Sequence, residues 1–430
     1  MHLRRKREKG TGTPPSTFNN FRITERLFKD RNAPPRTELA FDFHQIQWDS
    51  TEVDGQLRGR WTSENGEEVQ CYRVSLEGLG EVEMGQSRWK GKGKATDQDY
   101  AIIIPRIPGL VFFPSILPQP LQRSLVVESL QNARQPNVTS LDPHYKLPEE
   151  GLWNAWLEGK VDDSVESIQF RPSTPSLYDA DRLLKTDVAS PTTSLESSRA
   201  NTPELETKKE IAVRNLVPKL RWSNVGYHYN WTTKLYEFDR PFVPIPPLML
   251  RCCQALVKSM RWEHVFNDMA DDENRNRTTK RDWEKWNTNY EPDAGIVNFY
   301  QAKDTLTGHT DHSEVDAVQP LVSLSLGLSS IFLVGGLTKD IAPLAILLRS
   351  GDGLIMSGRE GRRAYHGLPR VLAETLPLYL QATCGGLGEE GLERDATNSW
   401  RPYGEYLERG ARININLRAG TRGFAETGHR

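Results

Sequence analysis

The pattern of apolar and polar positions makes the second half of this 430-residue chain far more regular than the first. From about residue 211 to residue 382, short apolar runs follow one another with glycine turns between them and without regularly alternating helices. Such runs are typical of β-strands in an antiparallel arrangement. We therefore predict an α+β fold that is mainly β, with a sandwich or jelly roll as its core.

The elements of this core can be placed along the sequence. Residues 245–260 begin with a pair of prolines and space their apolar residues as a helix does, and residues 120–130 show helical spacing as well. Residues 320–334 alternate and then run apolar, which predicts two strands separated near Gly327. Further strands are expected at 102–104, 110–113, 295–300, 345–348, 354–356 and 412–418.

Composition divides the chain into four segments. Residues 1–16 hold five basic side chains among glycine, threonine and proline, which predicts a disordered basic arm. Residues 17–159 form an amino-terminal extension, beginning with a short helix, and the start of the folded unit, although residues 48–100 show no clear pattern. Residues 160–210 are rich in Ser, Thr and Pro and predict a disordered insertion. Residues 211–425 form the main domain.

Charge and cysteine content bear on the binding partners and the cellular compartment of the protein. The formal net charge of -2 and the pI near 6.5 give no general sign of nucleic-acid binding, although a near-neutral total can hide basic patches. Four cysteines form neither a disulfide framework nor a zinc spacing, which favours a reducing compartment. No apolar run of membrane-spanning length occurs. We expect a soluble intracellular monomer of the cytoplasm or nucleus, with the mitochondrion as an alternative.

Three polar residues have the chemistry of a metal site. His309 and Asp311 are two positions apart, so their side chains share a face of an extended chain, and His366 follows 55 residues after Asp311. Two histidines and a carboxylate are the ligands of mononuclear iron sites that keep positions open. Each signal alone is weak, because a His-x-Asp triplet is common and a lone histidine is usually a satisfied polar residue. The adjacent His312 should point away, as a surface residue or a neighbour of the ligands.

Residues 412–418 combine an apolar face with a basic one. Because a strand turns successive side chains to opposite sides, Arg412, Asn414, Asn416 and Arg418 share one face. Two guanidiniums and two amides without an intervening acid suit a dicarboxylate, although a surface strand can also alternate in this way.

Taken in order, these residues resemble the AlkB family, and within it the eukaryotic first AlkB homologue of fungal type. The similarity covers residues 211–422 strongly and 108–145 weakly, and it rests on the ordered runs 220–231, 308–316, 320–323, 331–336, 350–352 and 369–372. The resemblance implies a double-stranded β-helix dioxygenase that uses Fe(II), 2-oxoglutarate and O2. It makes residues 211–425 an AlkB-like catalytic domain.

The resemblance also implies roles for individual residues. It makes His309, Asp311 and His366 the catalytic centre and iron ligands. It assigns 2-oxoglutarate binding to Asn298, Tyr300, Arg412, Asn414 and Arg418, with Asn416 standing where the family often has threonine. Which arginine meets which carboxylate of the co-substrate stays open.

Substrate recognition is expected in the motif at 221–231. Tyr227, Tyr229 and Trp231 alternate, so an extended lid would place them on one face where an extruded base could stack, and Arg221 and Trp222 precede them. The alternative is a set of core-facing aromatics. Two basic clusters are candidate phosphate contacts or solvated surface: Arg275, Arg277, Lys280 and Arg281, and Arg359, Arg362 and Arg363.

The resemblance implies oxidative N-demethylation of nucleic acid, in tRNA 1-methyladenine or methylated single-stranded DNA, as in DNA repair. Formaldehyde, succinate and CO2 would be released. Alternatives are an oxygenase or demethylase acting on a protein side chain such as histone lysine, and oxidation of tRNA 5-methylcytosine. An iron-free binding module is disfavoured by the complete ligand set. No membrane partner is expected.

Overall fold

The computed structural model describes residues 18–79, 83–84, 87–88, 99–168, 210–266, 283–311, 314, 317–383 and 394–419. The expected basic arm at 1–16, most of the expected insertion at 160–210, the basic cluster at 275–281 and His312 lie outside the described residues. The chain divides into two compact units, Met1–Thr139 with Arg221–Arg430, and Ser140–Leu220.

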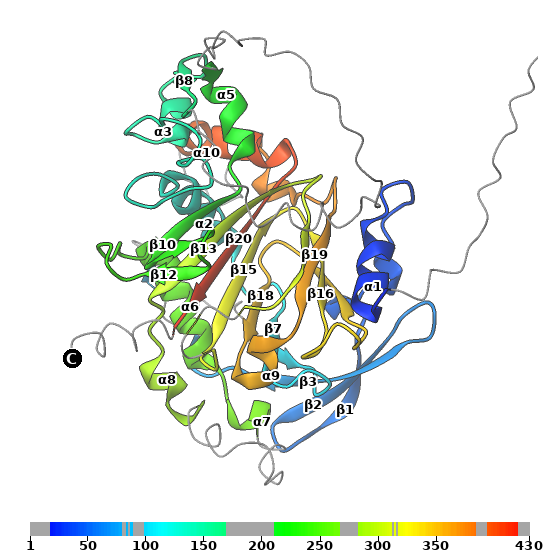
Figure 1. Cartoon of the computed structure of the whole chain (residues 1–430). Coiled ribbons are helices and arrows are strands. Elements are labelled where there is room, and N and C mark those ends of the chain that lie inside the picture. The colour runs from blue at the N-terminus through cyan, green and yellow to red at the C-terminus, as the bar shows by residue number, and fades with distance from the viewer. Residues whose placement is uncertain are drawn as a thin grey trace, which may run out of the picture. The chain divides into compact units, whose positions relative to one another are not determined.

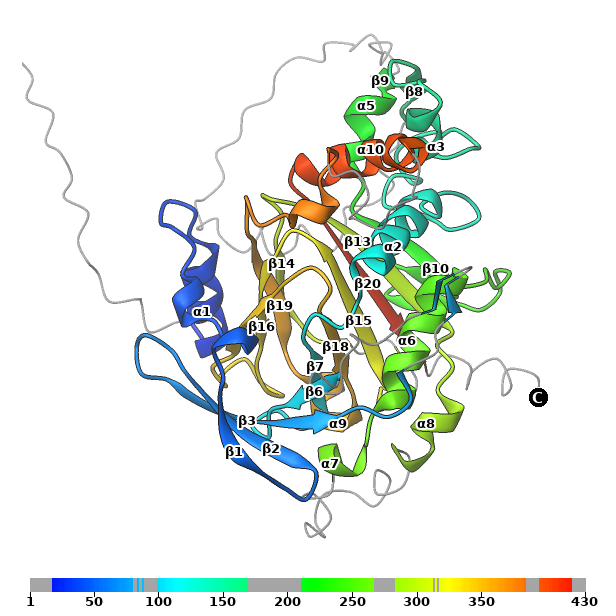
Figure 2. The ribbon, with the colours of Figure 1, turned by 180° about the vertical axis from the view of Figure 1, so that it is seen from behind.

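Two antiparallel sheets form the larger unit (Figures 1 and 2). The large sheet has ten strands, in the order β1 (Gln47–Val53), β2 (Gln56–Thr62), β3 (Glu68–Ser75), β6 (Tyr100–Ile103), β7 (Leu110–Phe113), β18 (Gly353–Met356), β15 (Leu321–Gly327), β20 (Ala411–Arg418), β13 (Ala294–Gln301) and β10 (Trp222–Gly226). The small sheet has four, in the order β14 (Leu306–His309), β19 (His366–Val371), β16 (Ser330–Val334) and β17 (Leu344–Leu348). The predicted jelly-roll core, mainly β with flanking helices, is confirmed.

Helices cover the outer face of the large sheet. Helices α2 (Gln119–Gln131) and α6 (Pro247–Ser259) pack against β20 and against each other. Strand β20 buries Ile413, Ile415 and Leu417 completely, whereas Asn414 and Asn416 on its other face are only half-buried. Because side chains alternate along a strand, its apolar side packs under the helices and its polar side faces the interior between the sheets.

The amino-terminal segment adds strands to the large sheet and a helix to the surface of the small sheet. Strands β1, β2 and β3 lie within residues 48–100, where the sequence showed no clear pattern, and they extend the large sheet. Helix α1 (Asn20–Lys29) packs on the small sheet instead, against β14 and β19. Its Phe21 and Phe28 are buried among apolar side chains of β16 and β17.

The remaining elements of this unit are short, except for α10 (Arg394–Glu408), which packs against β20 and α2. The short elements are η1 (Thr37–Leu39), η2 (Phe43–Gln45), β4 (Glu83–Met84), β5 (Ser87–Arg88), β11 (His228–Asn230), β12 (Leu235–Glu237), α7 (Glu263–Phe266), η6 (Trp283–Lys285), α8 (Trp286–Asn289), α9 (Gly358–Arg363) and η7 (Leu378–Leu380).

The smaller unit consists of α3 (Leu152–Leu157), β8 (Ser164–Glu166), β9 (Glu210–Ala212), α5 (Val213–Leu216) and η4 (Val217–Lys219). Strand β8 lies inside the segment whose composition indicated an insertion, and it pairs with β9. Among the described residues, no helix combines the length and apolarity that crossing a membrane requires.

Candidate metal centre and co-substrate site

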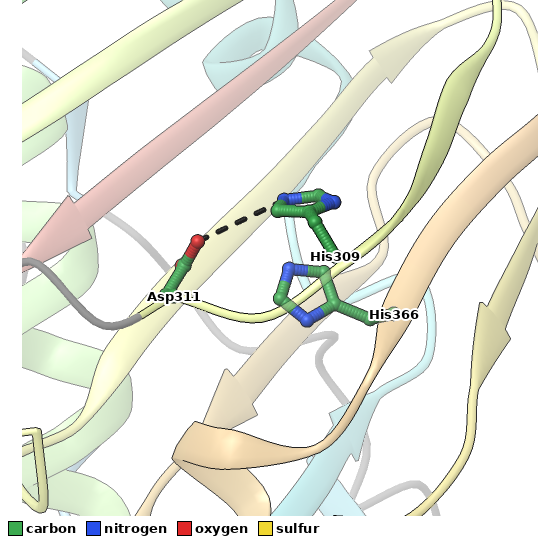
Figure 3. A group of neighbouring side chains, drawn as sticks. All are labelled: His309, Asp311 and His366. Atoms are coloured by element: carbon green, nitrogen blue, oxygen red, sulfur yellow. Dashed lines mark ion pairs between the residues drawn. The ribbon is translucent and has the colours of Figure 1, made fainter. Parts of the chain in front are cut away.

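Strand pairing brings the three expected metal ligands together. His309 is the last residue of β14, His366 is the first of β19, and the two are directly opposite in the register of this antiparallel pair. Asp311 follows β14 by two residues and points back toward the histidines (Figure 3). One potential ligand atom from each residue lies within 4.8 Å of the others.

Both imidazoles are held by the same kind of backbone contact. His309 Nδ1 lies 3.0 Å from the carbonyl oxygen of Thr307, and His366 Nδ1 lies 2.9 Å from that of Ala364. Because a carbonyl can only accept, each Nδ1 carries the proton and each Nε2 keeps its lone pair. This arrangement is the one that orients histidines for metal binding.

Electrostatics keep His366 and Asp311 in their ligating forms. Burial, with the neighbouring His309, lowers the pKa of His366 to about 4, so its ring is neutral at physiological pH. Burial raises the pKa of Asp311, but the charges of Arg418, the two histidines and Arg362 outweigh it and hold that pKa well below its usual range. Two imidazole nitrogens and one carboxylate therefore face a common point, which fits a divalent iron ion.

Helix α1 contributes to the placement of His309. The amide of Gly308 donates to Glu25 Oε1 at 3.2 Å, and Glu25 itself is buried beside Arg22. The ring of Phe21 lies so close to Gly308 that an added Cβ would stand 2.3 Å from its Cε1 atom. A glycine at this position therefore lets the helix press directly on the strand that ends in His309.

We expect Gly308→Ala to lower the free energy of unfolding by about 1–3 kcal/mol, the usual cost of overpacking. The new methyl group must displace Phe21, so the double variant Gly308→Ala with Phe21→Leu should lose less than the sum of its parts. Thermal unfolding measures both. Thr307→Ala, which changes an exposed neighbour, serves as the control, and an equal loss in that variant would contradict the argument.

The five expected co-substrate residues lie on adjacent strands of the large sheet. Asn298 is opposite Asn414 and Tyr300 is opposite Arg412 in the β13–β20 register, so these residues and Arg418 share the interior face. Asn414 Nδ2 donates to Ser323 Oγ at 2.8 Å, and Asn416 Nδ2 donates to Asn414 Oδ1 at 2.8 Å. The expected dicarboxylate face is thus already ordered by hydrogen bonds.

The two arginines of β20 have different surroundings. Arg418 Nη1 lies 2.6 Å from Glu314 Oε1 and 3.9 Å from Asp311 Oδ2. Arg412 donates only to neutral oxygens, those of Leu328 and Ser325, and its Nε atom has no partner. Within the described part of the chain Arg412 is 1% exposed and has no ion pair. An uncompensated buried cation of this kind is suited to a ligand carboxylate.

The expected aromatic substrate residues belong to one chain of ring contacts. Tyr229 and Trp231 are in contact, with ring centroids 5.1 Å apart, and Trp222 lies 5.3 Å from Trp231. Tyr227 packs against Phe238 and Phe242, and it is linked to Tyr229 through Phe238 and Tyr236. Trp231 remains 43% exposed, and Trp222 is the register partner of Asn298. The aromatic cluster therefore borders the co-substrate face.

Arg221 and Arg362, two of the arginines considered for substrate contact, lie in different surroundings. Arg221 is partly exposed and pairs with Asp304, its Nε lying 3.1 Å from the carboxylate. Arg362 is wrong as a candidate phosphate contact, because its side chain is completely buried and faces Glu314 and Asp311. Its neighbours Arg359 and Arg363 are exposed on α9.

The sequence argument missed two residues beside the centre. Glu314 lies in the motif that follows Asp311, and Tyr236 of β12 places its hydroxyl 3.4 Å from Glu314 Oε1. Neither shows a periodicity that separates it from surface residues. Only the fold brings the β11–β12 hairpin, which carries Tyr236, next to the segment that carries Glu314.

Comparison with known proteins gives the family. Residues 185–418 match the 2OG-Fe(II) oxygenase superfamily, and this match spans more than half of the chain. The chain belongs to this superfamily. As a 2OG-Fe(II) oxygenase it is a dioxygenase, and the family implies Fe(II) and 2-oxoglutarate as cofactor and co-substrate. The imidazole and carboxylate donors above, and the uncompensated Arg412, fit both.

Relatives extend beyond that region. Nucleic acid dioxygenase ALKBH1 of Mus musculus is 29% identical over 359 residues, 82% of this chain and 70% of that protein. DNA N(6)-methyladenine demethylase ALKBH1A of Arabidopsis thaliana is 30% identical over 325 residues, 75% of this chain and 78% of that protein. The tRNA demethylase abh1 of Schizosaccharomyces pombe is 28% identical over 281 residues, 64% of this chain and 72% of that protein. The expected membership of the AlkB family is confirmed.

Proposed function

We propose that this 2OG-Fe(II) oxygenase demethylates methylated bases in nucleic acid and releases formaldehyde, succinate and CO2. The observation that carries the proposal is the junction of three features on one interior face. His309 and His366 with Asp311 provide a metal set, Arg412 provides an uncompensated cation, and the aromatic cluster around Trp231 adjoins both.

His309, Asp311 and His366 would hold Fe(II), and Arg412, Asn414, Arg418, Asn298 and Tyr300 would hold 2-oxoglutarate. When bound, the metal and its co-substrate supply the oxidising chemistry that inserts an oxygen atom from O2 into a C–H bond. The protein's own part is to bind and orient. Burial around Tyr300, whose pKa it raises to about 12, keeps that hydroxyl protonated and able to donate.

Nucleic acid is favoured over a protein side chain by the aromatic cluster. Trp222, Tyr229 and Trp231 offer ring faces beside the site, and every base has a face that can stack on an aromatic ring. An enzyme that acts on a base must take it out of the stack into such a site. The names of the mouse, Arabidopsis and fission yeast relatives, which all refer to nucleic acid, support the same substrate class.

A parallel assay of formaldehyde and succinate tests the function. The purified protein with Fe(II) and 2-oxoglutarate would be given 1-methyladenine tRNA, 6-methyladenine single-stranded DNA, 5-methylcytosine tRNA and a methylated histone peptide. We expect equal amounts of formaldehyde and succinate with an N-methylated nucleic acid. Formaldehyde from the histone peptide alone would overturn the proposal. Succinate without formaldehyde on 5-methylcytosine would favour oxidation of that base instead.

Trp231→Ala should raise the KM for a methylated oligonucleotide about tenfold, because stacking of one base on an aromatic ring contributes about 1–3 kcal/mol. The KM for 2-oxoglutarate should stay unchanged. Leu235→Ala is the matched control, since Leu235 is a large exposed apolar residue of the same hairpin. If the two variants bind the oligonucleotide equally well, Trp231 does not contact the base.

A further inference from the structure

Four charged side chains meet behind the metal-binding face. Asp311 and Glu314 provide two negative charges, and Arg362 and Arg418 provide two positive ones. The side chains of Glu314 and Arg362 are completely buried, and that of Arg418 is 8% exposed. Burying charges costs several kcal/mol each unless they are paired, so their arrangement must be self-compensating.

The distances show where the pairing lies. Arg418 Nη1 is 2.6 Å from Glu314 Oε1 but 3.9 Å from Asp311 Oδ2. Arg362 Nη2 is 3.4 Å from Glu314 Oε2, whereas its Nη1 is 3.9 Å from Asp311 Oδ2. Both guanidiniums are thus closer to Glu314 than to Asp311. Glu314 binds the cations, and Asp311 only borders them.

The two oxygens of Asp311 consequently face different groups. Oδ1 lies 3.7 Å from His309 Nε2, on the metal-binding side, and Oδ2 faces the two guanidiniums. In the described part of the chain, Arg362 Nη1 and Nη2 have no hydrogen-bond partner, and Arg362 Nε donates to the carbonyl oxygen of Gln319 at 2.9 Å. Arg362 therefore has free donors that would turn to Asp311 if Glu314 lost its charge.

We propose that Glu314 is a positioning residue that holds Arg362 and Arg418 and thereby leaves Asp311 available to bind the metal. The inference rests on the iron centre proposed above. It gives Arg362, expected from sequence at a phosphate, the role of a buried counter-ion. If Glu314 loses its charge, Asp311 is the one anionic side chain left among these four charged residues. Arg362 and Arg418 would then compete with the metal ion for the Asp311 carboxylate.

The test measures Mn(II) binding to the whole chain by calorimetry, because this ion takes the same nitrogen and carboxylate ligands without redox chemistry. Glu314→Gln should weaken the affinity about ten- to a hundredfold, as loss of a residue that orients a ligand does. Glu314→Asp keeps the charge and should retain most of the binding. Adding Arg362→Met to Glu314→Gln removes the competing cation and should restore the affinity to within about threefold of the unmodified protein.

If Glu314 only stabilised the fold, the double variant would bind Mn(II) more weakly than Glu314→Gln alone. Two changes in the core would then lower stability and metal binding together. Asp42→Asn is the matched control for stability. The Asp42 carboxylate is buried and binds Arg349 through two contacts of 2.8 and 2.7 Å. This variant should lower the melting temperature but leave Mn(II) affinity unchanged within about twofold.

The outcomes separate the inference from the proposed function. If the unmodified protein binds no Mn(II), or if His309→Ala binds it equally well, the proposed iron centre fails. If the unmodified protein binds and Glu314→Gln binds as tightly, the centre stands and the positioning role is overturned. A double variant weaker than Glu314→Gln alone also overturns it.

Discussion

Replacing Asp311 by alanine is expected to reduce succinate and formaldehyde release at least about a thousandfold, which corresponds to about 4 kcal/mol of lost transition-state stabilisation. The remaining candidate ligands, the imidazoles of His309 and His366, carry no negative charge, so the metal ion would lose the negative charge of its set. Arg362 and Arg418, which face Asp311 Oδ2 at 3.9 Å, would add unfavourable positive charge. Product release at saturating Fe(II) measures the effect.

Two controls isolate the metal from general damage to the fold. Asp49→Ala removes an exposed carboxylate of β1 and should leave the activity unchanged. Chelation should silence the unmodified protein, and added Fe(II) should restore it, whereas the Asp311→Ala variant should stay silent under both conditions. Retention of about a tenth of the activity in that variant would place the metal on other residues.

The second large effect is expected from Arg412→Met, which should raise the KM for 2-oxoglutarate at least about a hundredfold, or about 3 kcal/mol. Burial lowers the pKa of Arg412 to about 10, because this guanidinium is desolvated and the neighbouring Tyr300 and Asp352 offset the effect only in part. A ligand carboxylate would supply the missing charge, and methionine cannot bind it.

Ligand-dependent stability provides an independent measurement of the same contact. With Mn(II) present, 2-oxoglutarate should raise the melting temperature of the unmodified protein but not that of the Arg412→Met variant. As the control, Arg349→Met removes an arginine that is paired with Asp42 and should keep the shift. If Arg418→Met loses more affinity for 2-oxoglutarate than Arg412→Met does, then Arg418 rather than Arg412 makes the main contact with the co-substrate carboxylate.

The strand pattern could be predicted because burial of one or both faces leaves a clear record in the sequence. Alternation identified the β20 face of Arg412, Asn414 and Arg418, and the observed β13 register places Asn298 and Tyr300 opposite it. Strands β1 to β3 left no such record. Most of β1 is exposed, and β2 buries only Gly59 and Trp61, so too few large apolar side chains recur there to reveal a strand period.

The sequence also did not reveal which charged side chains surround the metal centre, and the reason is different. Arg359, Arg362 and Arg363 look alike in sequence, yet only Arg362 is buried, because the 3.6-residue period of α9 turns it toward Glu314 while its neighbours face solvent. Tyr227 and Tyr229 look alike as well. Tyr227 differs in contacting Phe238 and Phe242, which lie in a segment that the alternation rule does not include.

The position of β7 within the large sheet has a practical consequence for isolating the catalytic region. Residues 185–418 match the superfamily, but β18 pairs with β15 on one side and with β7, residues Leu110–Phe113, on the other. A chain trimmed to the matched residues would leave unpaired the backbone amides and carbonyls that β18 directs toward β7. Such an edge pairs readily with another copy, so the trimmed protein would be an aggregation hazard rather than a minimal enzyme.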